Sequence, residues 1–164
     1  MTIVRPEVLE RQYPHIDLGA GFTKRGDECI TIDISANSSA DIIMDIGKEI
    51  LPFPNDSVEM IDCHQTIEHL DGEQRIFMMN EAYRVLKPKR TMYITCPYHD
   101  TKEATFDPTH KFPPLCEISF DYFSNKEFME YLQDLYNITA RFKIIKCKRG
   151  KSVDSWQLFT ELSK

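Results

Sequence analysis

Short apolar runs alternate with polar, glycine- or proline-containing segments along the first hundred residues. Two later stretches, 140–150 and 155–162, look like strands joined around Gly150, and so short a connection permits only antiparallel pairing. The pattern therefore predicts an α/β protein with five mostly parallel strands and a C-terminal antiparallel hairpin. The apolar runs with the length and composition of buried parallel strands are 15–18, 29–33, 41–44, 58–63 and 92–96.

The sequence predicts a helix over 71–87 but leaves no room for the helix that usually connects the first two parallel strands. Residues 71–87 begin with a capping-box-like pair, Asp71 and Gln74, and carry apolar side chains at helical spacing. Only eight residues, Phe22 to Cys29, separate the first strand's glycine turn from Ile30. A parallel crossover normally takes a dozen residues or more, usually as a helix. We therefore expect a Rossmann-like sheet with reduced helices in its first half and one thinly covered face.

A second helix is predicted over 124–136, where Ser124 and Glu127 form a capping box. Before it lies a segment of 27 residues, 97–123, without periodicity. Loops of that length in compact domains are usually functional or disordered, and the many aromatic and histidine residues here argue against disorder. The side chains that helical spacing turns toward the core in the second helix are Phe128, Leu132 and Leu135.

Composition restricts the setting of the protein. The 164 residues, 41% hydrophobic and 28% charged, suit one domain spanning 1–164. No apolar run reaches the roughly 18 residues of a membrane span, and the N-terminus lacks a signal-peptide core, so we expect a cytoplasmic protein without membrane contact. The five cysteines are scattered and form no C-x-x-C pair, which favours reduced thiols over a zinc site. A net charge of −6 argues against a nucleic-acid partner.

The stretch "HIDLGAGFTKRGDECITIDIS" has the order of a nucleotide site: strand, glycine turn, strand, acid. Gly19 and Gly21 allow a ligand to approach the backbone closely. Asp33 ends the second strand, where a carboxylate can accept hydrogen bonds from both hydroxyls of a ribose. Asp45 follows the third strand and could accept from an exocyclic amine. An alternative is that Asp33 and Asp45 only cap a strand end and a turn.

A nicotinamide or flavin dinucleotide does not fit this turn. The dinucleotide fingerprint needs a third glycine and a helix whose N-terminus holds the pyrophosphate. Lys24 stands where the third glycine would be, the helix is missing, and Asp33 follows Gly19 by only fourteen residues. The sequence therefore predicts a pocket for a nucleoside without phosphates.

The sequence resembles the class I S-adenosylmethionine (SAM)-dependent methyltransferases, and within them a short bacterial and phage branch. The resemblance spans about residues 14–136 and implies strand order 3-2-1-4-5-7-6 and SAM as cofactor. One departure is "LKPKR", where the family usually has "LKPGG". The matching stretches are "IDLGAGFTKRG", "ITIDIS", "ADIIMDIGKEILPFPNDSVEMIDCHQTIEHL", "EAYRVLKPKRTMYITCP", "DPTHKF" and "FDYFS".

The resemblance also implies roles for individual residues. The loop after the first strand would hold the methionine part, Asp33 the ribose, and Asp45 with Ile46 would flank the adenine. His64 and Gln65 would line the methionine end. "EHL" at 68–70 is read as structural. The candidate cofactor-binding residues are Asp17, Gly19, Ala20, Gly21, Asp33, Ile34, Asp45, Ile46, His64 and Gln65.

The acceptor side should come from the long segment after the fifth strand. A hydroxyl acceptor needs a base within hydrogen-bond reach, and His110, held by Asp107, is the preferred candidate, with His99 as a further catalytic candidate. The alternative is that "DPTH" is only a turn closed by Asp107 and Thr109. No two histidines have the spacing of one helical face, so no metal site is predicted.

The sequence therefore predicts a small methyltransferase that acts on a small-molecule or glycan-precursor acceptor. The alternative is a non-catalytic SAM- or nucleoside-binding protein, or a partner subunit, on the same fold. The strand-five segment distinguishes the two, because an enzyme should close it over the sulfonium methyl. The acceptor atom and the oligomeric state do not follow from the sequence.

Overall fold

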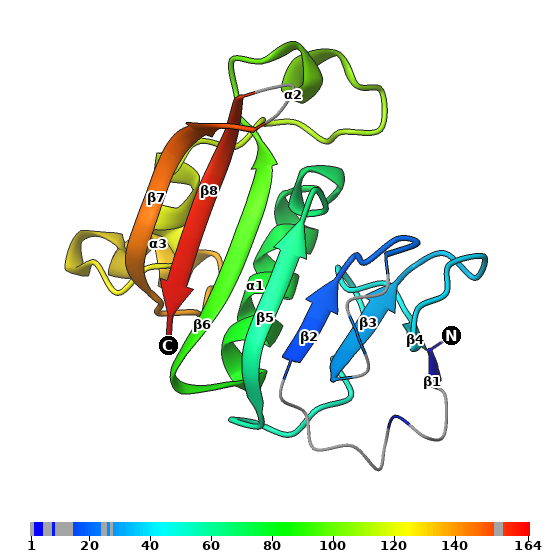
Figure 1. Ribbon diagram of the computed structural model, residues 1–164. Coiled ribbons are helices and arrows are strands. Elements are labelled where there is room, and N and C mark those ends of the chain that lie inside the picture. The colour runs from blue at the N-terminus through cyan, green and yellow to red at the C-terminus, as the bar shows by residue number, and fades with distance from the viewer. Residues whose placement is uncertain (1, 5–7, 9–14, 24–25, 27, 153–155) are drawn as a thin grey trace.

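The computed structural model describes residues 2–4, 8, 15–23, 26, 28–152 and 156–164. Its strands form one eight-stranded sheet in the order β1-β4-β3-β2-β5-β6-β8-β7 (Figure 1). The strands are β1 (Ile3–Val4), β2 (His15–Leu18), β3 (Cys29–Asp33), β4 (Ile42–Ile43), β5 (Val58–His64), β6 (Leu86–Pro97), β7 (Lys143–Lys151) and β8 (Trp156–Ser163). The helices are η2 (Ile67–His69), α1 (Gly72–Val85), α2 (Lys102–Phe106), η3 (Glu117–Phe123), η4 (Glu127–Met129) and α3 (Glu130–Leu135).

The topology confirms the predicted fold class. β4, β3, β2, β5 and β6 pair in parallel, and β8 joins β6 antiparallel with β7 as its hairpin partner. With the predicted strands numbered along the chain, this is the order 3-2-1-4-5-7-6. The two-residue strand β1, antiparallel to β4, was not predicted. Gly150 lies inside β7, opposite Gln157, so the hairpin connection follows it, partly outside the described residues.

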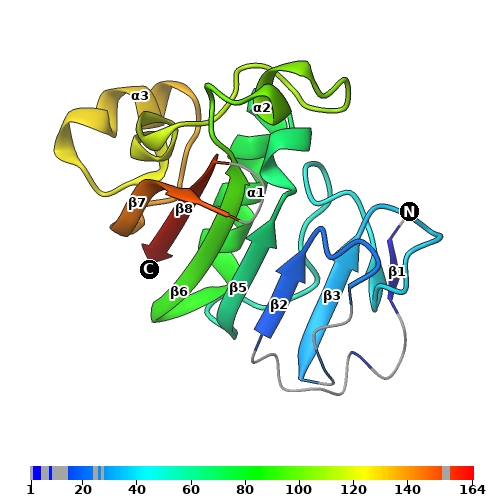
Figure 2. The same cartoon turned by 45° about the horizontal axis from the view of Figure 1, so that its top comes forward.

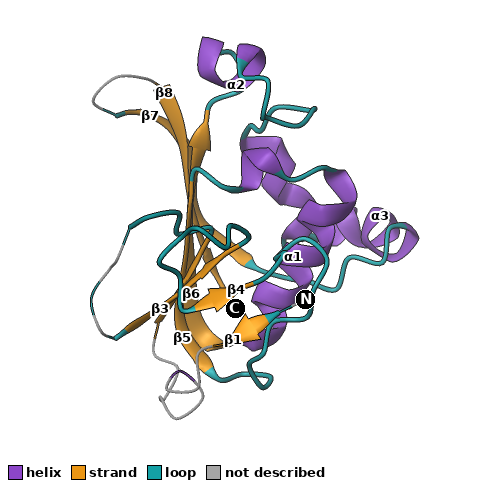
Figure 3. Ribbon diagram, turned by 90° about the vertical axis from the view of Figure 1, so that its right-hand side faces the viewer, coloured by secondary structure: helices purple, strands orange, loops and turns teal. Residues whose placement is uncertain are grey.

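The predicted lack of a helix between β2 and β3 is confirmed for the residues described there, 19–23, 26 and 28. The connections 34–41 and 44–57 are also without helix. Figure 3 shows α1 and α3 on one side of the sheet, and the described part of the chain places no α-helix on the other. In Figure 2, β2, β3 and β5 point the same way, with the α2 segment beyond the carboxyl ends of β5 and β6. One face of the sheet is therefore left to strands and loops.

The helix α1 begins as its sequence predicts. Asp71 Oδ1 accepts from the Gln74 backbone N–H at 3.0 Å, and Gln74 Oε1 accepts from the Asp71 N–H at 3.1 Å. This capping box satisfies two backbone donors that the helix itself cannot. Met79 and Ala82 are fully buried on its inner side. The helix therefore covers β5 and β6 and turns its N-terminus toward the carboxyl ends of the strands.

The second predicted helix has a different buried face. Phe128 and Leu135 are 70% and 56% exposed, so their expected burial is wrong. Gln133 is fully buried instead, because its side-chain amide donates to the carbonyls of Tyr122 and Ser124 at 2.9 and 2.7 Å. The segment also divides into η4 and α3. The spacing of apolar residues does not predict that a polar side chain is buried. The hydrogen bonds of Gln133 therefore give this helix a different buried face from the predicted one.

The fifth parallel strand, β6, begins six residues before its prediction, at Leu86 rather than Met92. The chain passes directly from α1 into the strand, and Lys89 adopts a φ of +64°. Its N–H donates to the carbonyl of Lys164 at 2.7 Å. Lys89 thus takes the left-handed conformation for which glycine is favoured, in the "LKPKR" stretch that departs from the family pattern.

Candidate functional site

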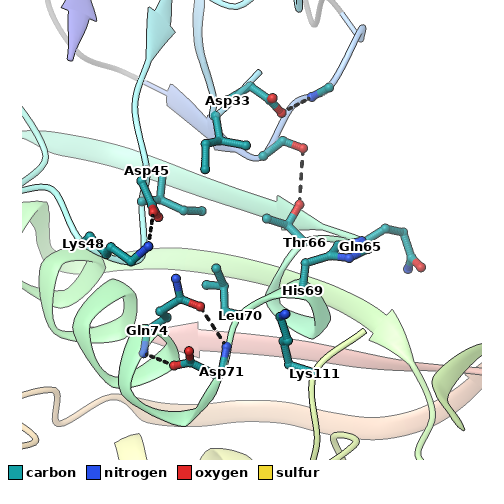
Figure 4. Close-up of a pocket in the computed structure, with 14 residues that line it drawn as sticks. Asp33, Asp45, Lys48, Gln65, Thr66, His69, Leu70, Asp71, Gln74 and Lys111 are labelled. Carbon is teal, nitrogen blue, oxygen red and sulfur yellow. Dashed lines mark hydrogen bonds and ion pairs between the residues drawn. The ribbon is translucent and has the colours of Figure 1, made fainter. Parts of the chain in front are cut away.

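A cleft of about 610 Å³ opens beyond the carboxyl ends of the parallel strands (Figure 4). This is where ligands bind in open α/β sheets, and the volume lies in the range of small-molecule pockets. The loops after β2, β3 and β4 form one side, and η2 with the start of α1 forms the other. The lining residues are Gly19, Gly21, Asp33, Ile34, Asp45, Ile46, Lys48, Gln65, Thr66, His69, Leu70, Asp71, Gln74 and Lys111.

The glycine turn after β2 forms the floor of the cleft. Gly19 and Gly21 have φ values of +78° and +58°, conformations that residues with a Cβ rarely adopt. The Gly19 N–H donates to the Ile32 carbonyl at 2.8 Å, which fastens the turn to β3. A Cβ on Gly19 would lie 2.2 Å from both Oγ1 and Cγ2 of Thr66. Glycine is therefore needed at position 19 for both its backbone angles and its lack of a side chain.

Asp33 is held in place by two backbone groups. Its Oδ2 accepts from the Gly21 N–H and its Oδ1 from the Ser35 N–H, both at 2.8 Å. The strand-end cap considered as an alternative is therefore present. Each carboxylate oxygen has a second lone pair, so the same group can still accept hydrogen bonds from a ligand. The neighbouring Ile34 is 68% exposed in the cleft wall and offers an apolar surface beside the carboxylate.

Asp45 also has partners within the protein. Its Oδ1 accepts from the Gly47 N–H at 3.0 Å, and its Oδ2 pairs with Lys48 Nζ at 3.0 Å. The turn cap considered for Asp45 is thus observed, and the carboxylate nevertheless lines the cleft. Lys48 was missed by the sequence analysis, although its spacing of three residues from Asp45 is compatible with such a pair.

The opposite wall comes from the segment after β5. Gln65 has a φ of +52°, and its N–H donates to the Thr95 carbonyl at 2.8 Å. The hydroxyl of Thr66 shares its one proton between the carbonyls of Gly19 and His64, at 3.2 and 3.0 Å, so it links this wall to the glycine turn. His69 follows on the same segment and faces the cleft.

The long segment 97–123 reaches the cleft through Lys111. The Lys111 N–H donates to the Glu68 carbonyl at 2.8 Å. Arg75, which is buried, donates from its guanidinium to the carbonyls of Lys111 and Pro113 at 3.1 and 2.7 Å, and to that of Ile67 at 3.2 Å. A helix side chain thus fixes both η2 and the long segment in place at the edge of the cleft.

Three of the predicted cofactor residues do not line the cleft. Asp17 and Ala20 are buried in and just after β2, 2% and 8% exposed, and support it from within. His64 lies elsewhere, because side chains alternate along a strand and the odd-numbered Ile61 and Cys63 face the helices. Its ring lines a separate hollow together with Asp62. The placement of His64 at the methionine end therefore does not agree with the structure.

His64 belongs to a polar cluster around Asp62. His15 Nε2 lies 2.9 Å and His64 Nε2 lies 3.6 Å from the Asp62 carboxylate, and His64 Nδ1 lies 2.9 Å from the Thr95 hydroxyl. Burial alone would raise the pKa of Asp62, but hydrogen bonds from His64 and His15 outweigh it and lower the pKa. The cluster stabilises the sheet face without helices.

The three predicted catalytic residues lie outside the cleft. His99 is exposed and its ring lies 4.6 Å from that of Tyr98. Asp107 Oδ1 accepts from the N–H and the hydroxyl of Thr109 at 2.8 and 2.6 Å, so "DPTH" is the turn that was considered. These bonds from Thr109 lower the pKa of Asp107. His110 Nε2 faces Asp107 Oδ2 at 3.7 Å, in a smaller hollow beside the cleft.

The sequence pattern did not predict several of the residues that line the cleft. Thr66, His69, Leu70, Asp71 and Gln74 come from the segment read as a loop and a helix start, where "EHL" was interpreted as structural. Lys111 comes from the expected acceptor segment but was not selected, because lysine is an ordinary surface residue. Glu68, just behind the wall, is buried, and burial raises its pKa to about 7.

Comparison with known proteins agrees with this geometry. Residues 17–94 match the family model described as "Methyltransferase domain". That range runs from β2 to β6 and contains most of the cleft residues. A search by sequence found no similar curated protein. No helix in the described part of the chain is long and apolar enough to cross a membrane.

Solved structures share the fold at low sequence identity. A SAM-dependent methyltransferase from Archaeoglobus fulgidus superposes with a TM-score of 0.65 at 15% identity, covering 93% of this chain and 86% of that one. One from Methanosarcina mazei gives 0.58 at 15% identity, covering 98% of each chain. The 1,6-didemethyltoxoflavin-N1-methyltransferase of Burkholderia thailandensis, solved with 1,6-didemethyltoxoflavin and S-adenosylhomocysteine, gives 0.61 at 10% identity, covering 96% and 73%.

Proposed function

We propose that the chain is a class I, SAM-dependent methyltransferase, that its cleft holds SAM along the carboxyl ends of β2, β3 and β4, and that the methyl group is exposed to a small-molecule or glycan-precursor acceptor. The observation that carries this proposal is the carboxylate of Asp33, fixed at the end of β3 by the Gly21 and Ser35 N–H groups. A carboxylate that is held in place before the ligand binds, and that keeps free lone pairs, can accept hydrogen bonds from the two ribose hydroxyls.

The remaining parts of the cofactor follow from that anchor. Ile34, Asp45 and Ile46 all line the cleft, which supports apolar contact of the two isoleucines with the adenine and a hydrogen bond from its exocyclic amine to Asp45. The glycine turn is next to the Asp33 carboxylate, so the methionine part lies along Gly19 and Gly21 toward Gln65 and Thr66. No described residue between β2 and β3 forms a helix whose N-terminus would bind a pyrophosphate, which favours a nucleoside over a dinucleotide.

The acceptor then approaches from the wall of His69 and Lys111. The enzyme must hold the nucleophile in line with the sulfonium methyl at about 3 Å, because SAM already carries the electrophile. The 97–123 segment borders this side through Lys111, whose backbone is bonded to Glu68. An overall charge of −6 is unfavourable for a nucleic-acid backbone and compatible with a small or uncharged acceptor.

The general base expected from this segment is part of the same proposal. His110 lies behind the wall with Asp107 at 3.7 Å, so a direct role as base would require its ring to turn toward the cleft. His69 already lines the cleft. An oxygen acceptor therefore has two histidines near it, one in the wall and one behind it.

Methyl transfer is tested with SAM labelled on its methyl group and a panel of small-molecule and glycan-precursor acceptors. We expect label to move to one acceptor class and to depend on Asp33, with Asp33→Asn as the matched variant. Binding of SAM without transfer to any acceptor in the panel would instead favour the non-catalytic binding protein. Absence of SAM binding would contradict the proposal altogether.

A further inference from the structure

A second group of chemically active side chains begins in the cleft wall with His69 and extends behind it. Glu68 and His69 come from η2, and His110 comes from the long segment about forty residues later. One oxygen or nitrogen atom from each of the three lies within 4.8 Å of the others. The rings of His69 and His110 meet edge to face with centroids 4.8 Å apart. The proposed cofactor site uses neither Glu68 nor His110.

Two atoms of this cluster have unsatisfied hydrogen-bonding capacity. Glu68 is only 6% exposed, and its Oε2 has no hydrogen-bond partner among the described residues. The same holds for Nδ1 of His110, which is shielded from solvent. Buried polar atoms are nearly always paired, and an orphaned one costs stability. Two such atoms in one cluster leave two lone-pair donors available to a ligand.

The other ring nitrogen of each histidine faces an acceptor. His69 Nδ1 lies 3.3 Å from the Thr109 carbonyl oxygen, which can only accept, so Nδ1 carries the proton and Nε2 carries the lone pair. His110 Nε2 faces Asp107 Oδ2 at 3.7 Å, which leaves Nδ1 as its coordinating nitrogen. Histidines that bind a metal almost always donate their second N–H to a carboxylate or a backbone carbonyl.

We propose that Glu68, His69 and His110 bind a divalent transition-metal ion of the manganese-to-zinc series at the wall of the cleft. Two imidazoles and one carboxylate form the donor set of zinc and of non-haem iron sites, and this set leaves coordination positions open. Calcium and magnesium prefer oxygen-only surroundings and fit less well. Since His69 also lines the cleft, the ion would be accessible from it.

Charges of both signs surround the cluster, and the positive charge of Arg75 acts on Glu68. Asp107 adds a second carboxylate beside the cluster, oriented by its two bonds from Thr109. The two segments are kept together by the backbone bond from Lys111 to Glu68 and by the Arg75 guanidinium. Ligand atoms about 2.1 Å from an ion lie about 3.0–3.4 Å apart, so the three ligand atoms, which lie within 4.8 Å of one another, would move closer by side-chain rotation on binding the ion.

The test uses the untagged full chain, stripped of metal with a chelator and titrated with Co²⁺ while the visible absorption is followed. We expect one bound ion per chain, with zinc displacing it. Glu68→Gln and His110→Ala should each weaken binding by more than about 100-fold, whereas Asp107→Asn should weaken it by about 10–100-fold, as outer partners do. His99→Gln is the matched control, an exposed histidine of the same segment, and should bind like the wild type.

Circular dichroism checks that each variant is folded. If Glu68→Gln fails to fold, His69→Ala, which changes an exposed side chain, carries the same test. Binding that is equal in the wild type, His69→Ala and His110→Ala would overturn the proposal, as would equal loss in His99→Gln. The metal site does not rest on the proposed methyl transfer: titrating the metal-free protein with S-adenosylhomocysteine tests the cofactor cleft separately.

Discussion

Replacing Gly19 with alanine tests the geometry of the glycine turn at a single atom. The new Cβ would lie 2.2 Å from Thr66 Oγ1 and Cγ2 and 2.8 Å from Thr66 Cβ. It would also sit on a residue with a φ of +78°. The left-handed conformation costs about 1–2 kcal/mol for a residue with a Cβ. Rotation of Thr66 to relieve the contact breaks the hydrogen bond that its one hydroxyl proton shares between the carbonyls of Gly19 and His64, worth about 0.5–1.5 kcal/mol.

These contributions sum to a loss of about 1.5–3.5 kcal/mol in the free energy of unfolding. Gly21→Ala is the matched control, because its φ is also positive, +58°, but the described residues leave its Cβ position open to 4 Å. That variant should lose only the conformational part, about 1–2 kcal/mol. The difference between the stability losses of Gly19→Ala and Gly21→Ala therefore measures the contact with Thr66.

The assay is urea unfolding of both variants, with the midpoint and the slope compared. In the Gly19→Ala/Thr66→Ala double variant, only the 2.8 Å contact between Cβ atoms remains of the clash. The double variant should therefore lose less than the sum of the two single losses. Equal losses for Gly19→Ala and Gly21→Ala, or full additivity in the double variant, would refute this account of the turn.

Three further predictions concern other parts of the fold. Asp33→Asn should weaken S-adenosylhomocysteine binding by about 1.5–3 kcal/mol in calorimetry, the value of hydrogen bonds to a charged group. Asp33→Ala should also lower the midpoint of urea unfolding, because it removes the hydrogen bonds from both backbone N–H groups. Asp71→Ala should destabilise the protein by about 1 kcal/mol in urea unfolding through loss of the helix cap, and Asp71→Ser should restore most of it. The pKa of Asp62 is lowered from its usual 3.8 in the folded protein, so its stabilising effect is present above pH 3.8 and is lost as the pH falls below that value. Asp62→Asn should therefore be less stable at neutral pH and should lose less stability than the wild type on acidification.

The parallel strands could be predicted closely because their burial leaves a simple signal. Runs such as 15–18 and 29–33 alternate apolar residues with a few polar ones, and the structure places β2 and β3 on the same residues. The capping box of α1 was equally local, since Asp71 and Gln74 are three residues apart. The glycine turn and Asp33 come together because both follow adjacent parallel strands, which end at the same edge of the sheet.

The features that the sequence did not predict depend on the direction of side chains and on contacts between residues far apart in the chain. The family resemblance placed His64 at the methionine end, but His64 is the last residue of β5, and strand alternation turns its side chain to the other face with Asp62. The cluster of Glu68, His69 and His110 joins two segments about forty residues apart, through a backbone bond and Arg75 that no spacing rule contains. The inward turn of Gln133 likewise depends on two backbone carbonyls in a preceding loop.

The central claim is that the cleft beside Asp33 is a SAM site, and calorimetric titration tests it most directly. The metal-free full chain is titrated in parallel with S-adenosylhomocysteine and with NAD. We predict binding of one S-adenosylhomocysteine per chain, weakened in Asp33→Asn, and no heat of binding with NAD. Saturable binding of NAD together with no binding of S-adenosylhomocysteine would contradict the account.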